Sequence, residues 1–477
     1  MRYLSSIDHL SALAMAFATA AQPAAAQCYL EQQQVLALDG TSSDEFGSAV
    51  AVSGSVALVG AWRDSAAASL SGSAYVFRLA PAGWMQEQKL VPADAAAFDF
   101  FGWSVAIDGD TAVVGAISDQ DAAPDGGSVY VFRYNGATWQ PEAELFASDA
   151  NDGDHFGVSV ALQGDTLLVG ADLNDQNGTW SGAAYVFRKE NGVWTERQKL
   201  EPSTPSSYEH FGASVDLDGD LLVVGAYGGP SQLFRGTAYV FRFNGQAWQE
   251  DAALVGSLSA SGDFFASAVA ISNGRVLCGA RWADVGTING TVLDTGEAYV
   301  FAHDGQSWYE EQRITEQDPQ PGDGLGYAVD LAPDLALIGV HNRDEFGVRS
   351  GEAVILRRFG SAWLHEPRVI PSDTREGDMF GLGVALQGRY ALIGAPHDDD
   401  RAPDAGAAYF FDLLECLPSL PGDLDGDGDV DQADLGILLA AFGTCAGDPG
   451  FNPAADIDGD GCVAQGDLGI VLSNFGQ

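Results

Sequence analysis

Short runs of alternating apolar and polar or small residues fill most of this 477-residue chain, and Gly, Asp and Asn separate them. Residues 101–116 form one such unit, in which two alternating runs flank a tight turn at 108–110. A polar loop follows, then a third run at 127–132 and a fourth segment that begins at Trp139. Period-2 runs joined by Asp-Gly turns are typical of antiparallel hairpins. The pattern predicts four short strands per unit, with no helical periodicity across residues 40–411.

A Phe-Gly pair or a degenerate copy of it marks the start of each unit. The copies begin at Phe46, Phe101, Phe156, Phe211, Phe265, Leu325 and Phe380, and their spacings are 55, 55, 55, 54, 60 and 55 residues. A fixed period of this size indicates a solenoid or a propeller. Four antiparallel strands in each of seven units favour an all-β fold, a seven-bladed β-propeller.

The seventh unit ends at residues 409–411 and lacks the strand that opens with tryptophan in the other units. Residues 29–39 align without gaps on residues 84–94, so we expect an N-terminal strand to complete the last blade and close the ring. Closure removes an exposed sheet edge. Cys28 and Cys416 flank the two closing strands, and a disulfide between them would lock the seam, although sequence leaves the connectivity open.

A second glycine motif ends the second strand of each unit. It is Gly-Ala in six units and Gly-Val in one, beginning at Gly60, Gly115, Gly170, Gly225, Gly279, Gly339 and Gly394. Together the two motifs resemble the FG-GAP repeats of the integrin α-subunit propeller and of many bacterial extracellular proteins, over residues 28–416. The resemblance implies a propeller with a ligand-binding face, and adhesion by analogy only. The integrin blade calcium loops are not expected, because tight turns such as 108–110 offer too few oxygens.

The N-terminus has the pattern of an export signal. Residues 1–26 combine Arg2, an apolar stretch from Leu10 to Ala21 and a small-residue site near Ala26, which predicts cleavage there and a secreted or cell-surface protein. No other stretch has the length and apolarity of a membrane span. The formal net charge of −45 disfavours nucleic acid as a partner, since phosphates require clustered Lys and Arg. Cys278 lies in an apolar run and is predicted to be a buried thiol.

After a linker at 417–421 the composition changes, and residues 422–477 contain eleven Asp and no Lys or Arg. Two twelve-residue segments 33 residues apart place carboxylates, a backbone carbonyl and glycine at the spacing of a calcium loop, each followed by a short apolar helix. The expected ligands of the first ion are Asp423, Asp425, Asp427, Asp429, Asp431 and Asp434. Those of the second are Asp456, Asp458, Asp460, Cys462 and Asp467, where Asp429 and Cys462 supply only their carbonyls.

Paired loops with Asp at position 12, each followed by one helix, resemble a bacterial dockerin, a small EF-hand-like α-helical domain. The resemblance implies folding coupled to two calcium ions and a cohesin-like partner. Ala464 departs from the pattern because it removes the side-chain ligand at position 9 of the second loop. The thiol of Cys462 is not needed for calcium, so it is available to pair with Cys445. The alternative is a terminal domain that calcium stabilises and that has no cohesin partner.

Two sets of propeller residues are candidates for binding. An acid stands two residues before each Phe-Gly position, and these seven carboxylates could hold cations at the channel mouth or, as we favour, accept backbone N–H groups in the adjacent turn. They are Asp44, Asp99, Asp154, Glu209, Asp263, Asp323 and Asp378. Large aromatics outside the repeat frame are candidate stacking platforms for a carbohydrate or anchors for a protein ligand, with surface decoration or local packing as the alternative. They are Trp62, Trp103, Trp180, Tyr227 and Trp282.

The sequence supports no assignment of catalytic residues. His155 and His210 precede Phe-Gly pairs, but other units carry Glu, Phe, Gly or Met there, so both are interpreted as tolerated variation. No nucleophile elbow, His-Glu-x-x-His motif or phosphate loop is present. We therefore favour a secreted, non-catalytic binding or adhesion protein docked by its C-terminal module. The alternatives are an enzyme of extracellular polysaccharide catabolism acting on glycosidic bonds, and a calcium-stabilised envelope protein.

Overall fold

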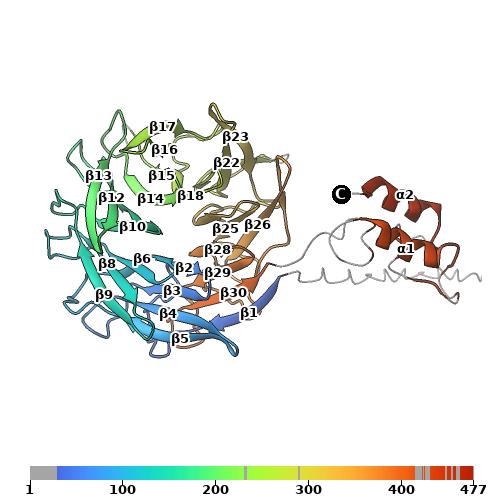
Figure 1. Ribbon diagram of the computed structural model, residues 1–477, viewed down its shortest axis with the longest axis horizontal. Helices are drawn as coiled ribbons and strands as arrows, with labels where there is room; N and C mark the ends of the chain where they lie inside the picture. The colour runs from blue at the N-terminus through green and yellow to red at the C-terminus, as the bar shows by residue number, and fades with distance from the viewer. Residues whose placement is uncertain are drawn as a thin grey trace, which may run out of the picture.

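The computed structural model describes residues 29–229, 234–287, 290–413, 422, 424, 430–445, 448, 450–452, 455–457 and 462–475. Across them, seven four-stranded antiparallel sheets stand around a common axis as the blades of a propeller (Figure 1). The all-β, seven-bladed fold predicted from the sequence is confirmed. The signal segment 1–26, the linker 417–421 and the predicted Cys28–Cys416 pair lie outside the described residues.

We number the blades in chain order and give the strands of each from the channel outward. Blade 1 holds β2 (Val50–Ser53), β3 (Val56–Ala61), β4 (Ser73–Ala80) and β5 (Gly83–Leu90), and blade 2 holds β6 (Phe101–Asp108), β7 (Thr111–Ala116), β8 (Ser128–Tyr134) and β9 (Trp139–Leu145). Blade 3 holds β10 (Phe156–Gln163), β11 (Thr166–Ala171), β12 (Ala183–Glu190) and β13 (Val193–Leu200), and blade 4 holds β14 (Phe211–Asp218), β15 (Leu221–Ala226), β16 (Thr237–Phe243) and β17 (Trp248–Leu254).

The last three blades depart slightly from this regular plan. Blade 5 holds β18 (Phe265–Ser272), β19 (Arg275–Ala280), β22 (Glu297–His303) and β23 (Trp308–Ile314), with an inserted hairpin of β20 (Val285–Thr287) and β21 (Gly290–Val292). Blade 6 holds β24 (Val329–Leu331), β25 (Leu335–Val340), β26 (Glu352–Phe359) and β27 (Ala362–His365). Blade 7 holds β28 (Val384–Gln387), β29 (Tyr390–Ala395), β30 (Ala407–Asp412) and, from the N-terminus, β1 (Leu30–Val35).

The N-terminal strand closes the ring as predicted. Strand β1 pairs antiparallel with β30, and Val35 lies opposite Ala408 in this ladder. On the neighbouring blade, the Trp84 ring stacks on Phe410 with 4.0 Å between centroids and 5° between planes. The first and last blades are thereby joined by both backbone pairing and side-chain packing.

Hydrophobic packing follows the same circle. Each of seven clusters of buried side chains in the described propeller is shared by two neighbouring blades: blades 1 and 2, 2 and 3, 3 and 4, 4 and 5, 5 and 6, 6 and 7, and 7 and 1. A single blade therefore buries its apolar faces only against its neighbours, which is the physical meaning of the repeat.

The two glycine motifs meet between blades. A Cβ at Gly60 would lie 2.1 Å from the carbonyl oxygen of Gly102, which is the Phe-Gly glycine of the next blade. A Cβ at Gly102, where φ is +96°, would lie 2.3 Å from the carbonyl oxygen of Ser73. Glycine is the residue that best tolerates both the close approach and the left-handed backbone, although blade 5 carries Ala266 at this position with φ of +60°. Backbone contact between blades thus explains why the two motifs recur together.

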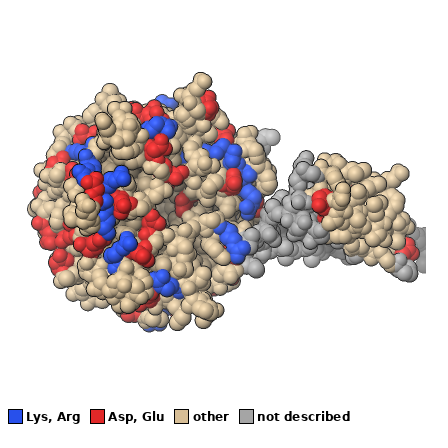
Figure 2. Space-filling view, in the orientation of Figure 1, with Lys and Arg blue, Asp and Glu red and all other residues tan. Residues whose placement is uncertain are grey.

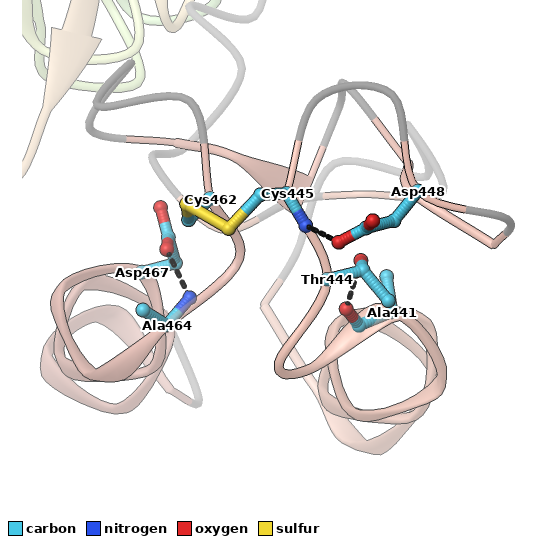
Figure 3. The surroundings of a disulfide bond; sticks show 7 residues. All are labelled: Ala441, Thr444, Cys445, Asp448, Cys462, Ala464 and Asp467. Carbon is cyan, nitrogen blue, oxygen red and sulfur yellow. Dashed lines mark hydrogen bonds between the residues drawn. A yellow bond between two sulfur atoms is a disulfide. The ribbon is translucent and has the colours of Figure 1, made fainter.

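The C-terminal segment forms a separate small core. Helices α1 (Gln432–Ala441) and α2 (Gln465–Asn474) follow the two predicted loops. Their apolar residues pack in one cluster that includes Val430, Leu438 and Val471. Cys445 and Cys462 form the predicted disulfide beside the ends of the helices (Figure 3).

Candidate functional site

One backbone conformation recurs at the channel mouth in every blade. The residue before each Phe-Gly pair has positive φ, between +54° and +74°, and we call these the left-handed positions: Glu45, Phe100, His155, His210, Phe264, Gly324 and Met379. For a residue with a Cβ this conformation costs about 1 to 2 kcal/mol. Only blade 6 has glycine there. The other six blades keep a side chain at this position although its backbone conformation is unfavourable, as is common at binding sites.

A second variable position faces the first. It follows the Gly-Ala pair at the end of the second strand, and we call these the strand-end positions: Trp62, Ile117, Asp172, Tyr227, Arg281, His341 and Pro396. Inner strands begin and second strands end at the same side of an antiparallel blade, so both sets lie on one face of the propeller. We call these fourteen positions, together with the side chains that pack directly on them, the rim. They differ in chemistry from blade to blade although the backbone around them repeats.

Aromatic side chains of blades 1 and 2 form the first cluster on the rim. The Trp62 ring packs edge-on against Phe100 and Trp103, with centroid distances of 5.3 and 5.0 Å. Arg63 lies over Trp62 at 5.4 Å and forms an ion pair with Glu45 at 2.6 Å. Trp103 is 37 % exposed and lines the channel. The structure thus brings together two of the sequence candidates, the half-buried Trp62 and the exposed Trp103, and their role in ligand binding stays a prediction.

A longer chain of contacts runs through blades 3 to 6. His210 stacks on Tyr227 at 4.5 Å, and Tyr227 stacks on Phe264 at 5.5 Å. Arg281 then lies over Phe264 and over Tyr327, at 5.3 and 5.2 Å from the ring centroids. At the far end, the buried His341 contacts Tyr327, and at the near end the exposed Trp180 contacts His210; these ring centroids are 4.2 and 5.9 Å apart. The rim thus carries a continuous aromatic and cationic surface.

The structure unites three polar rim residues that the sequence did not connect. Asp172 lies between two histidines, with Nδ1 of His155 3.8 Å and Nδ1 of His210 3.5 Å from its carboxylate oxygens. Asp172 and His210 are both buried. The interpretation of these histidines as tolerated variation is therefore incomplete, because both rings lie within 4 Å of the Asp172 carboxylate. Aligning the seven units and comparing the columns beside the two motifs would have found them.

Trp282 differs from the other four aromatic candidates. Its backbone N–H donates to the carbonyl of Asp263, and its side chain is half-buried beside Arg281. It takes part in neither rim cluster within the described chain. Trp282 therefore lies outside the two clusters that contain Trp62, Trp103, Trp180 and Tyr227, and all five residues stay predictions as ligand contacts.

The channel behind the rim is a cavity of about 340 Å³ lined by the inner strands of all seven blades. Asp216 and Asp330 line it, and sequence reasoning missed both. Burial and the charge of Asp330 raise the pKa of Asp216 to about 8, and burial raises the pKa of Asp330 to about 6. Each carboxylate also accepts an N–H group from the next inner strand, Ile271 for Asp216 and Leu386 for Asp330. These residues mainly connect neighbouring blades.

The seven acids before the Phe-Gly pairs all hydrogen-bond within the turn that precedes the inner strand. Each carboxylate accepts the backbone N–H of the residue three positions earlier, over distances of 2.5 to 2.9 Å: Thr41 to Asp44, Ala96 to Asp99, Asn151 to Asp154, Ser206 to Glu209, Ala260 to Asp263, Gln320 to Asp323 and Arg375 to Asp378. This is the turn-capping role favoured from the sequence. These acids fix the backbone that leads into the rim.

The two predicted calcium loops share one hydrogen-bond pattern. Asp434 is completely buried and accepts N–H groups from Leu424 and Asp431, at 2.6 and 2.8 Å. At the equivalent position, the completely buried Asp467 accepts them from Ile457 and Ala464, at 2.6 and 2.7 Å. Figure 3 shows Asp467 beside the disulfide.

These carboxylates suit a calcium site. Two fully buried carboxylates need a positive charge, and residues 422–477 contain no Lys or Arg. The donor set, oxygen ligands only, fits a hard cation. Of the predicted ligands, Asp431, Asp434, Asp456, Cys462 and Asp467 are described, whereas Asp423, Asp425, Asp427, Asp429, Asp458 and Asp460 lie outside the described residues.

Charge on the propeller is mixed. Figure 2 shows Lys and Arg in small groups beside Asp and Glu, without a broad basic surface on the visible face. No helix within the described residues is long and apolar enough to cross a membrane.

Comparisons with known proteins agree with the repeat frame. Seven stretches match the sequence model of the FG-GAP repeat: residues 29–77, 84–132, 139–187, 194–241, 248–301, 308–356 and 363–411. No curated protein matches the chain. Among solved structures, the crystal structure of the Saccharomyces cerevisiae Sqt1 aligns with a TM-score of 0.43 and 10 % identity, covering 81 % of this chain and 98 % of that one. Because the repeat matches span most of its residues, this protein belongs to the FG-GAP repeat family.

Proposed function

We propose that this protein is an exported, non-catalytic binding protein whose propeller rim binds an extracellular carbohydrate. The observation that carries the proposal is the set of left-handed positions, where six blades accept a strained backbone to keep Glu, Phe, His or Met at the channel mouth. FG-GAP propellers are a binding and adhesion type of protein, and the rim is the variable part of this repeat.

The chemistry of the rim suits a sugar chain. Exposed indole faces at Trp103 and Trp180 offer flat apolar surfaces for pyranose rings. Next to Trp180, Asp172 and its two histidines supply acceptors and donors for hydroxyl groups, and Arg281 adds a donor. Aromatic platforms interleaved with hydrogen-bonding groups are the usual composition of a ligand site.

A glycan array probed with the full chain tests the proposal. For a glycan that binds, the separate substitutions Trp103→Ala and Trp180→Ala should each weaken affinity at least about tenfold in isothermal titration calorimetry. The control is Tyr309→Ala, because Tyr309 is a similarly exposed aromatic on the outermost strand β23, outside the rim. Equal losses in all three variants, or binding only to a protein partner, would contradict carbohydrate recognition by the rim.

We further propose that the C-terminal module binds two calcium ions and docks the propeller to a cohesin-like partner on a surface or in a multi-protein assembly. The support is the pair of buried acids at equivalent loop positions, the absence of any basic residue in 422–477, and the resemblance to dockerins. Calcium supplies the positive charge that orders the loops, while Asp434 and Asp467 hold each loop onto the start of its helix.

Hydrogen-exchange mass spectrometry on the full chain separates calcium binding from docking. Calcium should slow exchange in residues 430–475, and Asp467→Asn should abolish the effect in the second half of the module. A pull-down with cohesin domains, with and without chelator, then tests the partner. If calcium slows hydrogen exchange but no cohesin domain is captured, the module is a terminal domain that calcium stabilises, and the docking role is wrong.

A further inference from the structure

One position on the outermost strands differs between blades in a way that points to an ion. It lies five residues after the aromatic residue that opens each outer strand, and for blades 1 to 7 it is Lys89, Glu144, Lys199, Ala253, Arg313, Arg368 and Gln34. In the first three blades it lies directly opposite a tyrosine of the third strand: Tyr75, Tyr130 and Tyr185. In five of the seven blades, the side chain at this position on the outer strand can donate hydrogen bonds.

Blade 1 shows what this position does. The ammonium group of Lys89 lies 2.7 Å from Asp39 and 2.6 Å from the buried Asp64. The Tyr75 hydroxyl donates to the same two carboxylates, at 3.0 Å each. The cation therefore neutralises a pair of acids that the tyrosine holds in place.

The other blades fill the same place in related ways. In blade 3, Lys199 pairs with Asp149 at 2.8 Å, and in blade 5, Arg313 pairs with the buried Glu297. In blade 7 the amide of Gln34 donates to Asp373 and Asp400, at 3.2 and 3.1 Å. In blade 4, where the residue is Ala253, a cavity of about 500 Å³ borders Tyr239 and Glu209.

Blade 2 keeps the acids and loses the cation. Tyr130 donates to Asp94 at 3.3 Å and to the buried Asp119 at 2.8 Å, as Tyr75 does in blade 1. Glu144 replaces the lysine, and Asp121 adds a carboxylate where blade 1 has an alanine. None of the ion pairs found in the described chain includes any of these four acids. One carboxylate oxygen of Glu144 is buried without a hydrogen-bond partner in the described structure.

The oxygens are close enough to share one ion. Ligand oxygens of Asp94, Asp121 and Glu144 all lie within 4.8 Å of one another. Two oxygens that each bind one calcium ion at about 2.4 Å cannot be more than about 4.8 Å apart. Three converging carboxylates and open access to water suit a hard divalent cation.

We propose that blade 2 binds a calcium-type divalent cation through Asp94, Asp121 and Glu144, in the place that the lysine ammonium occupies in blades 1 and 3. The Tyr130 hydroxyl positions Asp94, and water completes the coordination. Its ligands come from the β5–β6 loop, the β7–β8 loop and strand β9, which are different segments from the β6–β7 turn and from the predicted C-terminal calcium loops. The ion would fasten the outer strand of blade 2 as Lys89 fastens that of blade 1.

Counting bound calcium on the full chain tests this proposal. Isothermal titration calorimetry and native mass spectrometry should show one ion fewer for Glu144→Lys than for the unmodified protein, because the new ammonium reproduces blade 1. Glu144→Gln keeps the size of the side chain and should weaken that one site at least about tenfold. Asp467→Asn should remove a different ion, so failure of the C-terminal sites and failure of this site are distinguishable.

A transplant provides the matched gain of function. Ala66→Asp combined with Lys89→Glu gives blade 1 the same four acids as blade 2, and this variant should bind one ion more than the unmodified protein. If the unmodified protein and Glu144→Lys bind the same number of calcium ions, the proposal is wrong. The acids of blade 2 would then be held together by a shared proton instead of a metal ion. A folded transplant that gains no ion would also count against it.

Discussion

At the scale of single residues, the paired glycines at the blade contacts carry the fold. Because a Cβ at Gly102 would lie 2.3 Å from a backbone oxygen, we expect Gly102→Ala to lower the free energy of unfolding by about 3 kcal/mol or more. Gly109 in the same blade also has positive φ, but nothing lies within 4 Å of a Cβ there. Gly109→Ala should therefore cost only about 1 kcal/mol. Urea unfolding of both variants checks this, and equal losses would refute the contact argument.

A second residue-scale prediction concerns pH. Burial, Arg281 and Arg349 lower the pKa of His341 to about 4, whereas an unfolded histidine titrates near 6.5. The unfolded chain binds this proton more readily, so stability is present above pH 6.5 and is lost as the pH falls toward 4. Between pH 7 and 4.5, the unmodified protein should lose about 2 to 3 kcal/mol more stability than His341→Gln. Denaturant titrations at both pH values measure the difference, and parallel losses would disprove this role for His341.

At the scale of elements, the closing strand β1 decides whether the ring is complete. Val35 is 4 % exposed and packs where blades 7 and 1 meet, so a charged residue there would be buried without a partner. We expect Val35→Asp to cost about 3 kcal/mol or more and to promote aggregation through the freed edge of β30. Leu38 lies just beyond β1 and is 68 % exposed, so Leu38→Asp is the matched control, within about 0.5 kcal/mol. Thermal unfolding with light scattering distinguishes them.

At the scale of the whole molecule, two cores should unfold separately. The seven interblade clusters form a closed circle, whereas the C-terminal cluster around Val430 and Leu438 shares no residue with them. We predict two calorimetric transitions, of which chelator moves the smaller one most strongly, since a module this small depends on its metal and disulfide. A single transition that is insensitive to chelator would contradict metal-coupled folding of the module.

The sequence by itself determined the repeating architecture. The Phe-Gly and Gly-Ala motifs mark where each blade begins and where its second strand ends, because glycine best fits the backbone contact between blades. The gapless alignment of residues 29–39 on 84–94 likewise determined the closing strand, and the position of Cys462 indicated its pairing with Cys445. These features are local and recur along the chain, so the sequence pattern alone is enough to predict them.

Only the tertiary structure decided which side chains act together. His155, Asp172 and His210 belong to two blades, and Arg281 lies over the rings of Phe264 and Tyr327 from neighbouring blades. The acids of blade 2 are up to 50 residues apart, from Asp94 to Glu144, and converge because sheet pairing sets Glu144 opposite Tyr130. Such groupings depend on how strands pair and how blades are angled around the axis. The sequence of a single unit specifies neither the strand pairing nor the angle between blades. The rim and the blade 2 site can therefore be recognised only in the closed ring.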